Sequence, residues 1–283
     1  MFIVTGASGK LGRKVVENLL LHVPADEIGV SVRDPKKVSD IVVRVRQGDF
    51  SDAASLRHAW IGARRLLLIS SNAAATGGDP LEQHAIAIRI AREIGVERIF
   101  YTSQVSSSAT SHFPPGRDHA ATEKMLAESG IAWTAMRHGF YAASALMMHK
   151  RGFDAGKLEG PEDGKVAWAT HDDLAAADAA LLAGDEVIDG PTPPLTGSEA
   201  LDLADIAELA GRMLGKPIER TVVSEESMEA TARNAGMPDG SIAVMLGYYR
   251  AARAGEFRAI DPALARMLGR APETMSTFLK ANL

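Results

Sequence analysis

The chain begins with an apolar stretch, a turn that contains three glycines and the start of a helix, all within residues 2–15. In such a turn Gly6 lets the chain leave the strand tightly, Gly9 lets the backbone approach a ligand, and Gly12 lets the helix pack on the sheet. The first helical N–H groups and the helix dipole then favour an anion. The spacing is Gly-x-x-Gly-x-x-Gly, which can also be a purely structural turn. Between a strand and a helix, it predicts a site for a dinucleotide diphosphate, formed by Gly6, Ala7, Ser8, Gly9, Lys10, Leu11 and Gly12.

Apolar stretches and stretches with helical periodicity alternate along the first half of the chain. The predicted strands are residues 2–4, 28–32, 42–46, 66–70, 98–102 and 132–137. The predicted helices between them are residues 11–21, 51–60, 81–94 and 116–129. Residues 66–70 read Leu-Leu-Leu-Ile-Ser, as in a parallel strand covered on both faces. The alternation predicts an α/β fold with a Rossmann-type, doubly wound parallel sheet.

The pattern loosens after about residue 141, and we expect a smaller α-rich carboxyl-terminal lobe there, interwoven with the sheet. Its predicted elements are helices over residues 141–150, 172–182, 203–214 and 225–235, strands over 166–169 and 219–223, loops over 152–164 and 191–194, and a mostly helical tail from 241. The predicted domains are an NAD(P)-binding domain over residues 1–150 and a substrate-covering lobe over residues 151–283.

Composition excludes several other classes of protein. The net charge of -5 gives no basic surface for nucleic acid. The absence of cysteine excludes disulfides and thiolate chemistry. No apolar run reaches the roughly 18 residues that a membrane span needs, and the glycine turn begins too early to leave room for a signal peptide. We therefore expect a cytoplasmic protein without a membrane segment, and an exposed amphipathic helix makes a homodimer unsurprising.

The second predicted strand ends in Arg33, which is followed by Asp34 and a proline. An acidic residue at this place accepts hydrogen bonds from the ribose 2′-OH of NAD, whereas an arginine pairs with the 2′-phosphate of NADP. Asp-Pro after a strand is typical of a turn, so we assign Asp34 to capping and predict that Arg33 selects NADP(H). The alternative is a solvated surface arginine beside a site that takes either cofactor.

Polar residues also follow the third and fourth predicted strands. Asp49 can accept from the adenine amino group while Phe50 covers the ring; alternatively, Asp49 or Ser51 caps the next helix and Phe50 is buried. A Ser-Ser-Asn run at residues 70–72 lies at the sheet edge where ligands bind in such folds. The predicted cofactor site therefore also includes Asp49, Phe50, Ser70, Ser71 and Asn72.

Several motifs in combination resemble the NmrA-like atypical short-chain dehydrogenases. They are residues 2–12, Arg33, Gly48-Asp49-Phe50, Leu66–Ser71, Tyr101-Thr102-Ser103, His119 with Glu123-Lys124, and Arg137–Tyr141. Within that family the chain looks most like the bacterial NADPH:quinone oxidoreductases and triphenylmethane reductases, over nearly its whole length. The resemblance implies that His138, Gly139 and Phe140 contact the nicotinamide end of the cofactor. Those enzymes usually have asparagine in place of His138, which points to a different contact or substrate here.

The proton donor of ordinary short-chain dehydrogenases is replaced in this chain. Those enzymes use a Tyr-x-x-x-Lys pair, whose tyrosine serves the substrate carbonyl. On the matching helix His119 stands in place of the tyrosine and Glu123 in place of the lysine. A quinone or conjugated cation, which accepts hydride directly, therefore fits better than a ketone. His119 is a candidate proton donor and Ser103 can polarise a substrate oxygen, although both can also serve as structural caps.

Aromatic and methionine side chains are the remaining candidates, because they can stack on a flat substrate. They are Phe140, Tyr141, Phe113, Met147, Met148 and Trp168, each of which can equally belong to the core. The predicted catalytic residues are His119, Ser103 and Tyr141. No histidine pair has metal-ligand spacing, so we expect no metal.

The sequence as a whole predicts an NADPH-dependent reductase of quinones or similar conjugated aromatics. One alternative is a redox sensor that binds NADP(H) without turnover. The other is a biosynthetic oxygenase or isomerase on the same fold.

Overall fold

The computed structural model describes residues 1–185 and 187–283, without the side chains of residues 75 and 76. The chain forms two compact units. The first contains residues 1–103, 118–137 and 171–193, and the second contains residues 104–117, 138–170 and 194–283. The two units therefore interleave along the sequence.

A seven-stranded sheet forms the centre of the first unit, in the order β10-β6-β5-β4-β1-β2-β3. Its strands are β1 (Phe2–Thr5), β2 (Ile28–Val32), β3 (Arg44–Gln47), β4 (Arg65–Leu68), β5 (Arg98–Gln104), β6 (Ala132–His138) and β10 (Gly190–Pro191). β1 pairs in parallel with both β2 and β4, and the pairs β2–β3, β4–β5 and β6–β10 are also parallel. The strand order reverses at β1, as in a doubly wound sheet. The predicted Rossmann-type α/β fold is confirmed.

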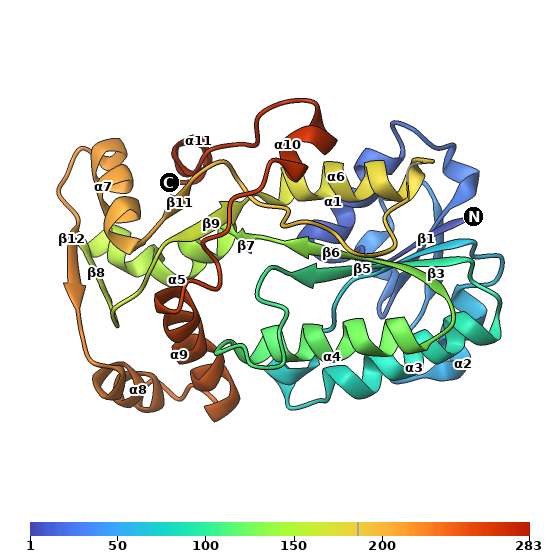
Figure 1. The fold of residues 1–283 in the computed structure, drawn as a ribbon, viewed down its shortest axis with the longest axis horizontal. Helices are drawn as coiled ribbons and strands as arrows, with labels where there is room; N and C mark the ends of the chain where they lie inside the picture. The colour runs from blue at the N-terminus through green and yellow to red at the C-terminus, as the bar shows by residue number, and fades with distance from the viewer. Residues whose placement is uncertain (186) are drawn as a thin grey trace. The chain divides into compact units, whose positions relative to one another are not determined.

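Helices cover both faces of this sheet (Figure 1). One face carries α1 (Lys10–Leu19) and α6 (His171–Ala183), and the other carries α2 (Ala53–Ala59), α3 (Pro80–Glu93) and α4 (Pro114–Glu128). The short 3-10 helices are η1 (Ala25–Glu27), η2 (Pro35–Val38) and η3 (Ala73–Thr76). Leu66, Leu67 and Leu68 of β4 are fully buried, as a strand covered on both faces requires.

The second unit contains two small sheets and most of the remaining helices. The sheets are β11-β9-β7 and β12-β8, built from β7 (Phe140–Tyr141), β8 (Lys157–Gly160), β9 (Val166–Ala169), β11 (Ala200–Leu201) and β12 (Glu219–Val222). The helices are α5 (Ala142–Ala155), α7 (Leu203–Leu214), α8 (Glu225–Asn234), α9 (Asp239–Arg253), α10 (Ala263–Leu268) and α11 (Met275–Asn282). Among the described residues no helix is long and apolar enough to cross a membrane.

The loop predicted over residues 152–164 is wrong in its first half. Helix α5 continues to Ala155 and ends at Gly156, whose φ of 75° closes the helix in the left-handed conformation that glycine adopts readily. Strand β8 then pairs in parallel with β12, about sixty residues further along the chain. Strand β8 is only four residues long and lies in a glycine-rich stretch, which is typical of a loop. The short strand β10, which overlaps the predicted loop over 191–194 at Pro191, was missed because its two residues are a glycine and a proline, which are typical of turns.

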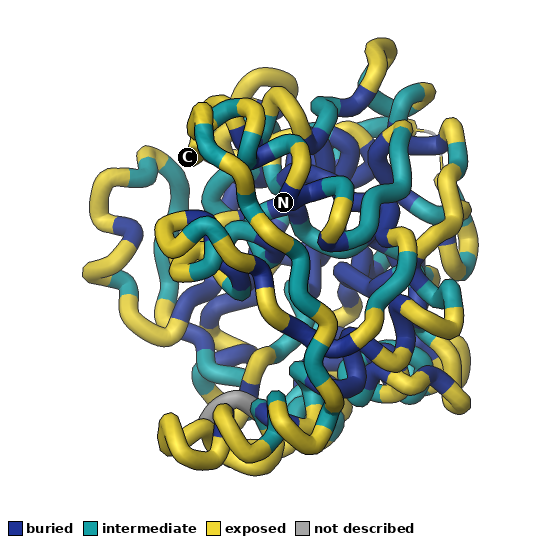
Figure 2. The backbone as a smooth tube through the Cα atoms, turned by 90° about the vertical axis from the view of Figure 1, so that its left-hand side faces the viewer, coloured by how far each residue is buried: buried dark blue, intermediate teal, exposed yellow. Residues whose placement is uncertain are grey.

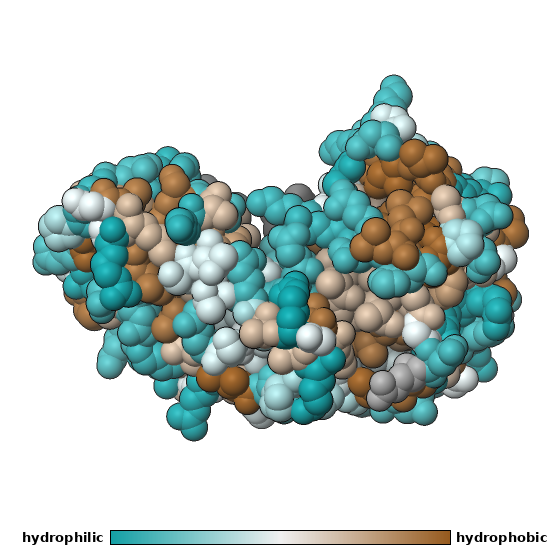
Figure 3. All heavy atoms as spheres, turned by 90° about the horizontal axis from the view of Figure 1, so that it is seen from above, coloured by the Kyte–Doolittle hydropathy of each residue, from teal (hydrophilic) through white to brown (hydrophobic). Residues whose placement is uncertain are grey.

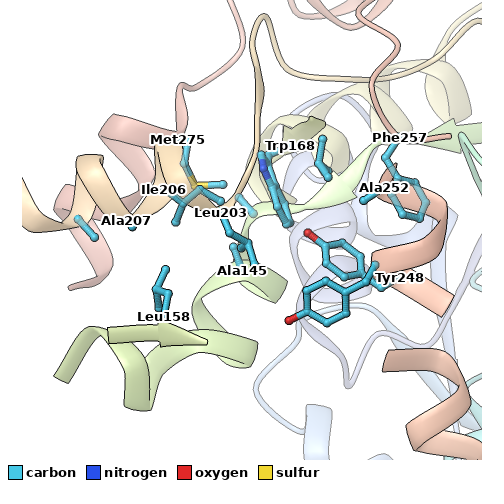
Figure 4. Packing of buried hydrophobic residues seen from close by; sticks show 14 of the residues in the cluster. Ala145, Leu158, Trp168, Leu203, Ile206, Ala207, Tyr248, Ala252, Phe257 and Met275 are labelled. Atoms are coloured by element: carbon cyan, nitrogen blue, oxygen red, sulfur yellow. The ribbon is translucent and has the colours of Figure 1, made fainter. Parts of the chain in front are cut away.

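Aromatic side chains dominate the core of the second unit. Phe140 packs with its ring centroid 5.0–5.7 Å from those of four other aromatic residues: Phe113, Trp168, Tyr248 and Phe257. Figure 4 shows Trp168, Tyr248 and Phe257 beside aliphatic residues of α5 and α7. In Figure 2 the buried residues lie along inner segments of the chain and the exposed ones follow outer turns.

The surface in Figure 3 is mostly hydrophilic, with apolar patches between the polar side chains. The large apolar residues exposed in the first unit include Leu21, Val42 and Ile61.

Candidate functional site

The glycine turn between β1 and α1 is closely packed. Gly6 has a φ of 64°, and the Gly9 N–H donates to the Gly6 carbonyl at 2.9 Å. A Cβ on Gly12 would lie 2.5 Å from the Gly6 oxygen, so no side chain fits there. The helix thus begins directly behind the turn, with its first N–H groups at the carboxyl end of β1.

A cleft of about 350 Å³ lies at the carboxyl ends of β1, β2, β3 and β4 in the first unit. This is the topological switch point, where ligands bind in doubly wound sheets. The predicted cofactor residues that line it are Gly6, Ser8, Arg33, Asp49, Phe50, Ser70, Ser71 and Asn72. The structure therefore brings the ends of four strands together around one cavity of ligand-binding size.

Other residues of the predicted glycine-turn site do not line this cleft. The side chains of Ala7 and Leu11 are buried, with 0% and 6% exposure, because they pack into the core beneath the turn. Their contribution to a ligand is therefore limited to the backbone. Lys10 is exposed on the first turn of α1.

Arg33 lies at the end of β2, exposed and lining the cleft. Within residues 1–185 and 187–283 no hydrogen bond or ion pair engages its guanidinium. Asp34 instead caps η2, since its carboxylate accepts the N–H of Lys36 at 3.1 Å, as predicted for an Asp-Pro turn. The cleft thus presents one cation without a carboxylate partner, as a phosphate group requires.

Asp49 and Phe50 combine features of both predicted roles. The Asp49 carboxylate accepts the N–H of Ser51 at 2.9 Å, and Phe50 packs against the sheet core while lining the cleft. The prediction that Asp49 or Ser51 caps the next helix is wrong. Asp52 caps α2, because its carboxylate reaches the N–H groups of residues 54 and 55.

Half of the residues that line the cleft do not belong to the site predicted from the sequence. The missed residues are Ser31, Val32, Gly48, Ile69, Ala73, Gly77, Gly78 and Gln83. A Cβ on Gly48 would lie 2.2 Å from Ser31 Oγ, so any larger residue would force the Ser31 side chain to move. The signal for Gly77 and Gly78 is the Gly-Gly-Asp-Pro run ahead of α3, a turn followed by a helix cap. Gln83 lies inside a helical pattern and carries no signal of its own.

A second polar cluster, also in the first unit, joins β5, β6 and α4. Ser103 Oγ donates to Glu123 Oε1 at 2.6 Å, and Arg137 donates to the same carboxylate at 3.1 and 2.7 Å. Ser103 is 2% exposed and Glu123 is 8% exposed. The hydroxyl proton of Ser103 is thus directed to Glu123, and a paired carboxylate stands where ordinary short-chain dehydrogenases have lysine.

The predicted donor His119 contacts a tyrosine of β5. Its Nδ1 lies 2.8 Å from the hydroxyl oxygen of Tyr101, which is fully buried. In the neutral imidazole, if Tyr101 donates to Nδ1, then Nε2 carries the proton; if Nδ1 donates to Tyr101, then Nε2 is an acceptor. His119 is half-buried, so its ring is both fixed and accessible.

The predicted nicotinamide contacts belong to the second unit. His138 is 1% exposed with Nδ1 3.5 Å from the Tyr141 hydroxyl, and Gly139 donates its N–H to Leu195 at 2.8 Å. Phe140 is half-buried in the aromatic core.

Most of the candidate stacking side chains belong to the core of the second unit. Phe113 and Trp168 are 7% and 3% exposed, so the stacking role considered for them is replaced by core packing. Met148 packs against the same cluster, whereas Met147 is exposed. Within the described ranges no group of three or more histidine, aspartate or glutamate side chains could hold a metal ion.

Comparison with known proteins gives consistent matches over nearly the whole chain. A family model described as NAD(P)H-binding matches residues 6–183. Quinone oxidoreductase 2 of Escherichia coli (strain K12) is 37% identical over 246 residues, which are 85% of this chain and 84% of that protein.

Two solved structures have closely similar folds. The crystal structure of the Escherichia coli NADPH-dependent quinone oxidoreductase QOR2 complexed with NADPH superposes with a TM-score of 0.92 at 33% identity, covering 99% of each chain. Citrobacter sp. triphenylmethane reductase complexed with NADP(H) superposes with a TM-score of 0.90 at 28% identity, covering 100% of each chain. The resemblance found in the sequence motifs is confirmed.

Proposed function

Because this chain belongs to the NAD(P)H-binding family and is an NAD(P)H-dependent oxidoreductase, we propose that it uses NADPH to reduce a quinone or a similar conjugated aromatic. The observation that carries the proposal is a cleft at the carboxyl ends of β1 to β4, in a chain whose helix α4 lacks the Tyr-x-x-x-Lys pair. The names of the relatives, a quinone oxidoreductase and a triphenylmethane reductase, support the same acceptor class.

Three features of the first unit support NADP(H) as the cofactor. Gly12 lets α1 pack directly against the Gly6 backbone, which places the N-terminus of the helix at the turn, where a diphosphate would bind. Arg33 supplies a cation for a 2′-phosphate. Ser31 Oγ, in the cleft lining, is buried without a hydrogen-bond partner in the described part of the chain, so a ligand hydroxyl or phosphate can satisfy it.

NADPH, when bound, supplies the hydride. A quinone that takes this hydride also takes one proton and becomes a hydroquinone, whereas a triphenylmethane cation becomes a neutral leuco dye with the hydride alone. Either product needs much less help from a positioned acid than an alkoxide does. The chain therefore acts by binding, orienting and shielding the two reactants.

His119 is our candidate for the proton of the quinone reaction. Its Nδ1 is held at Tyr101, so its Nε2 can carry and release a proton. Glu123, by contrast, is held by Ser103 and Arg137, and we assign this trio to fixing the ends of β5 and β6.

The direct test mixes the protein with NADPH and either a set of quinones or a set of triphenylmethane dyes. We expect the absorbance of the reduced nicotinamide to fall faster than in the protein-free mixture. Binding of NADPH without faster oxidation by any acceptor would contradict the proposal and favour a redox sensor.

A further inference from the structure

The loop that follows β4 is held by side chains from three different elements. The N–H of Ile69 donates to Thr5 Oγ1 of β1 at 2.9 Å, and the N–H of Ser70 donates to Thr102 Oγ1 of β5 at 2.9 Å. The N–H of Ser71 donates to His84 Nε2 of α3 at 2.8 Å. Three consecutive amides beyond the end of a strand are thus each fixed, in a loop that lines the nucleotide cleft.

The hydrogen bonds of His84 determine its tautomer. A backbone N–H can only donate, so Nε2 carries no proton and Nδ1 carries one. Nδ1 lies 2.8 Å from Thr122 Oγ1, which in turn donates to the Asp118 carbonyl at 2.9 Å. The imidazole therefore links the cleft loop to α4, the helix that carries His119.

His84 is also held neutral by its surroundings. It is 1% exposed, and burial lowers its pKa to about 4. Its ring meets Tyr101, the partner of His119, edge-on at 5.4 Å. An apolar residue would fill this space, but only an acceptor can satisfy the Ser71 N–H.

Gln83, the preceding residue, binds the side chains of the same region. Its Oε1 accepts from Ser71 Oγ at 2.5 Å, and its Nε2 donates to Ser51 Oγ at 2.9 Å. Ser51 follows Phe50 at the end of β3, so Gln83 connects the loops after β3 and β4. Gln83 also lines the cleft itself.

We propose that Gln83 and His84 are positioning residues that hold the loops after β3 and β4 in the conformation that binds NADP(H). His84 fixes the backbone of Ser71, and Gln83 fixes the side chains of Ser71 and Ser51. The inference rests on the proposed function of the cleft as the cofactor site. It adds a second anchor to that site, on a helix that carries no phosphate-binding motif.

Two substitutions of His84 separate positioning from general stability. In His84→Gln the side-chain oxygen reaches the place of Nε2, so the Ser71 N–H keeps its acceptor while the bond to Thr122 is lost. In His84→Asn the side-chain nitrogen takes the place of Nδ1, so the bond to Thr122 is kept while Ser71 loses its acceptor. Both variants replace a buried ring with an amide and carry a similar cost in packing.

The readout is the Kd for NADPH, from nicotinamide fluorescence, beside the Tm of each variant. We expect His84→Asn to raise the Kd about tenfold, and His84→Gln to stay within about threefold of the unsubstituted protein. Thr122→Val removes the other partner of His84. We expect this variant to have a lower Tm, with a Kd for NADPH within about threefold of that of the unsubstituted protein. Two results would overturn the proposal. One is an equal Kd for His84→Asn and His84→Gln, and the other is a Kd that rises in proportion to the loss of Tm across these two variants and Thr122→Val.

Gln83→Ala provides a second test at a half-buried position that tolerates truncation. We expect it to raise the Kd for NADPH by about threefold to tenfold with a small change in Tm. An unchanged Kd in Gln83→Ala would overturn the positioning role of Gln83. If His84→Asn does not fold, the same result would overturn the proposal as a whole. If the unsubstituted protein binds NADPH but reduces no acceptor, only the proposed reductase activity is contradicted. The positioning role is tested by the Kd for NADPH, which does not depend on turnover.

Discussion

Two buried histidines, one in each unit, show how differently the units use polar groups. His84 in the first unit has both ring nitrogens engaged, by Ser71 and Thr122, and connects α3 to α4 and to the loop that lines the cleft. His149 on α5 in the second unit is 5% exposed, and its Nε2 has no hydrogen-bond partner among the described residues. Burial lowers the pKa of both to about 4. Desolvation alone therefore does not distinguish a connecting histidine from one that mainly fills space.

The same contrast extends to the surroundings of each histidine. The first unit places hydroxyls, a carboxylate and guanidinium groups at the carboxyl ends of its strands, whereas the second packs five aromatic rings together. We expect substitutions in the first unit to change ligand binding and those in the second to change stability. Four predictions test this difference.

The largest effect is expected from Phe257→Ala in the aromatic core. Phe257 is fully buried against Phe113, Phe140 and Tyr248, so truncation should lower the free energy of unfolding by about 3–5 kcal/mol. Denaturant titration measures the change. Tyr248→Phe is the matched control: it keeps the ring and removes a hydroxyl that has no partner within the described residues, so stability should be unchanged or higher by about 1 kcal/mol.

Acid should destabilise both units through their buried histidines. Each pKa is about 4 in the folded protein and about 6.5 in the unfolded chain, so between these values the unfolded chain binds more protons. Stability should fall as the pH drops from about 6.5 to about 4, by up to roughly 3 kcal/mol for each histidine, and then level off. His149→Leu, followed by denaturant titration at several pH values, should reduce this slope; the same slope in the variant would contradict the assignment.

Arg33→Ala should change cofactor choice and leave stability nearly unchanged. Loss of a charged hydrogen-bond partner should weaken NADPH binding by about 1–3 kcal/mol and leave NADH binding the same. Fluorescence titration with both cofactors measures the difference. Equal losses for NADPH and NADH would show that Arg33 does not read the 2′-phosphate.

The smallest effect is expected from His119→Gln, and it should depend on the acceptor. Quinone reduction needs a proton and should slow about tenfold, less than the roughly 10²- to 10⁴-fold typical of general acid catalysis because a hydroquinone anion needs little help. Reduction of a triphenylmethane cation needs no proton and should keep its rate. The measurement is kcat of His119→Gln and of the unsubstituted protein with each of the two acceptors at saturating NADPH. Slowing of both reactions to the same degree would assign His119 a structural role.

Local sequence patterns correctly predicted those features of the fold that depend on residues close together in the sequence. The glycine turn, the buried strand β4 and the cap by Asp34 were all predicted, because each depends on residues within a few positions. The strand β8 was missed because its four residues lie in a glycine-rich stretch that is typical of a loop. Asp52 was missed as a cap because Asp49 and Ser51, which precede it within three residues, are also residue types that cap helices.

The site was predicted less completely than the fold. Strand ends such as Arg33 and Ser71 could be placed, since parallel strands bring their carboxyl ends to one edge. Gln83 and His84 could not, because a helical pattern shows which residues are buried and says nothing about the loop amide that a buried side chain will meet. The same limit applies to Phe113 and Trp168, whose burial follows from packing between distant segments.

The three anchored amides of Ile69, Ser70 and Ser71 have a consequence for how the cofactor is admitted. Their protons should exchange with deuterated solvent as slowly as those of β4, although they lie outside the strand. We therefore expect these three residues to be ordered before the cofactor binds. The entropy of ordering the loop is lost during folding, before any ligand arrives, so more of the contact energy remains as affinity.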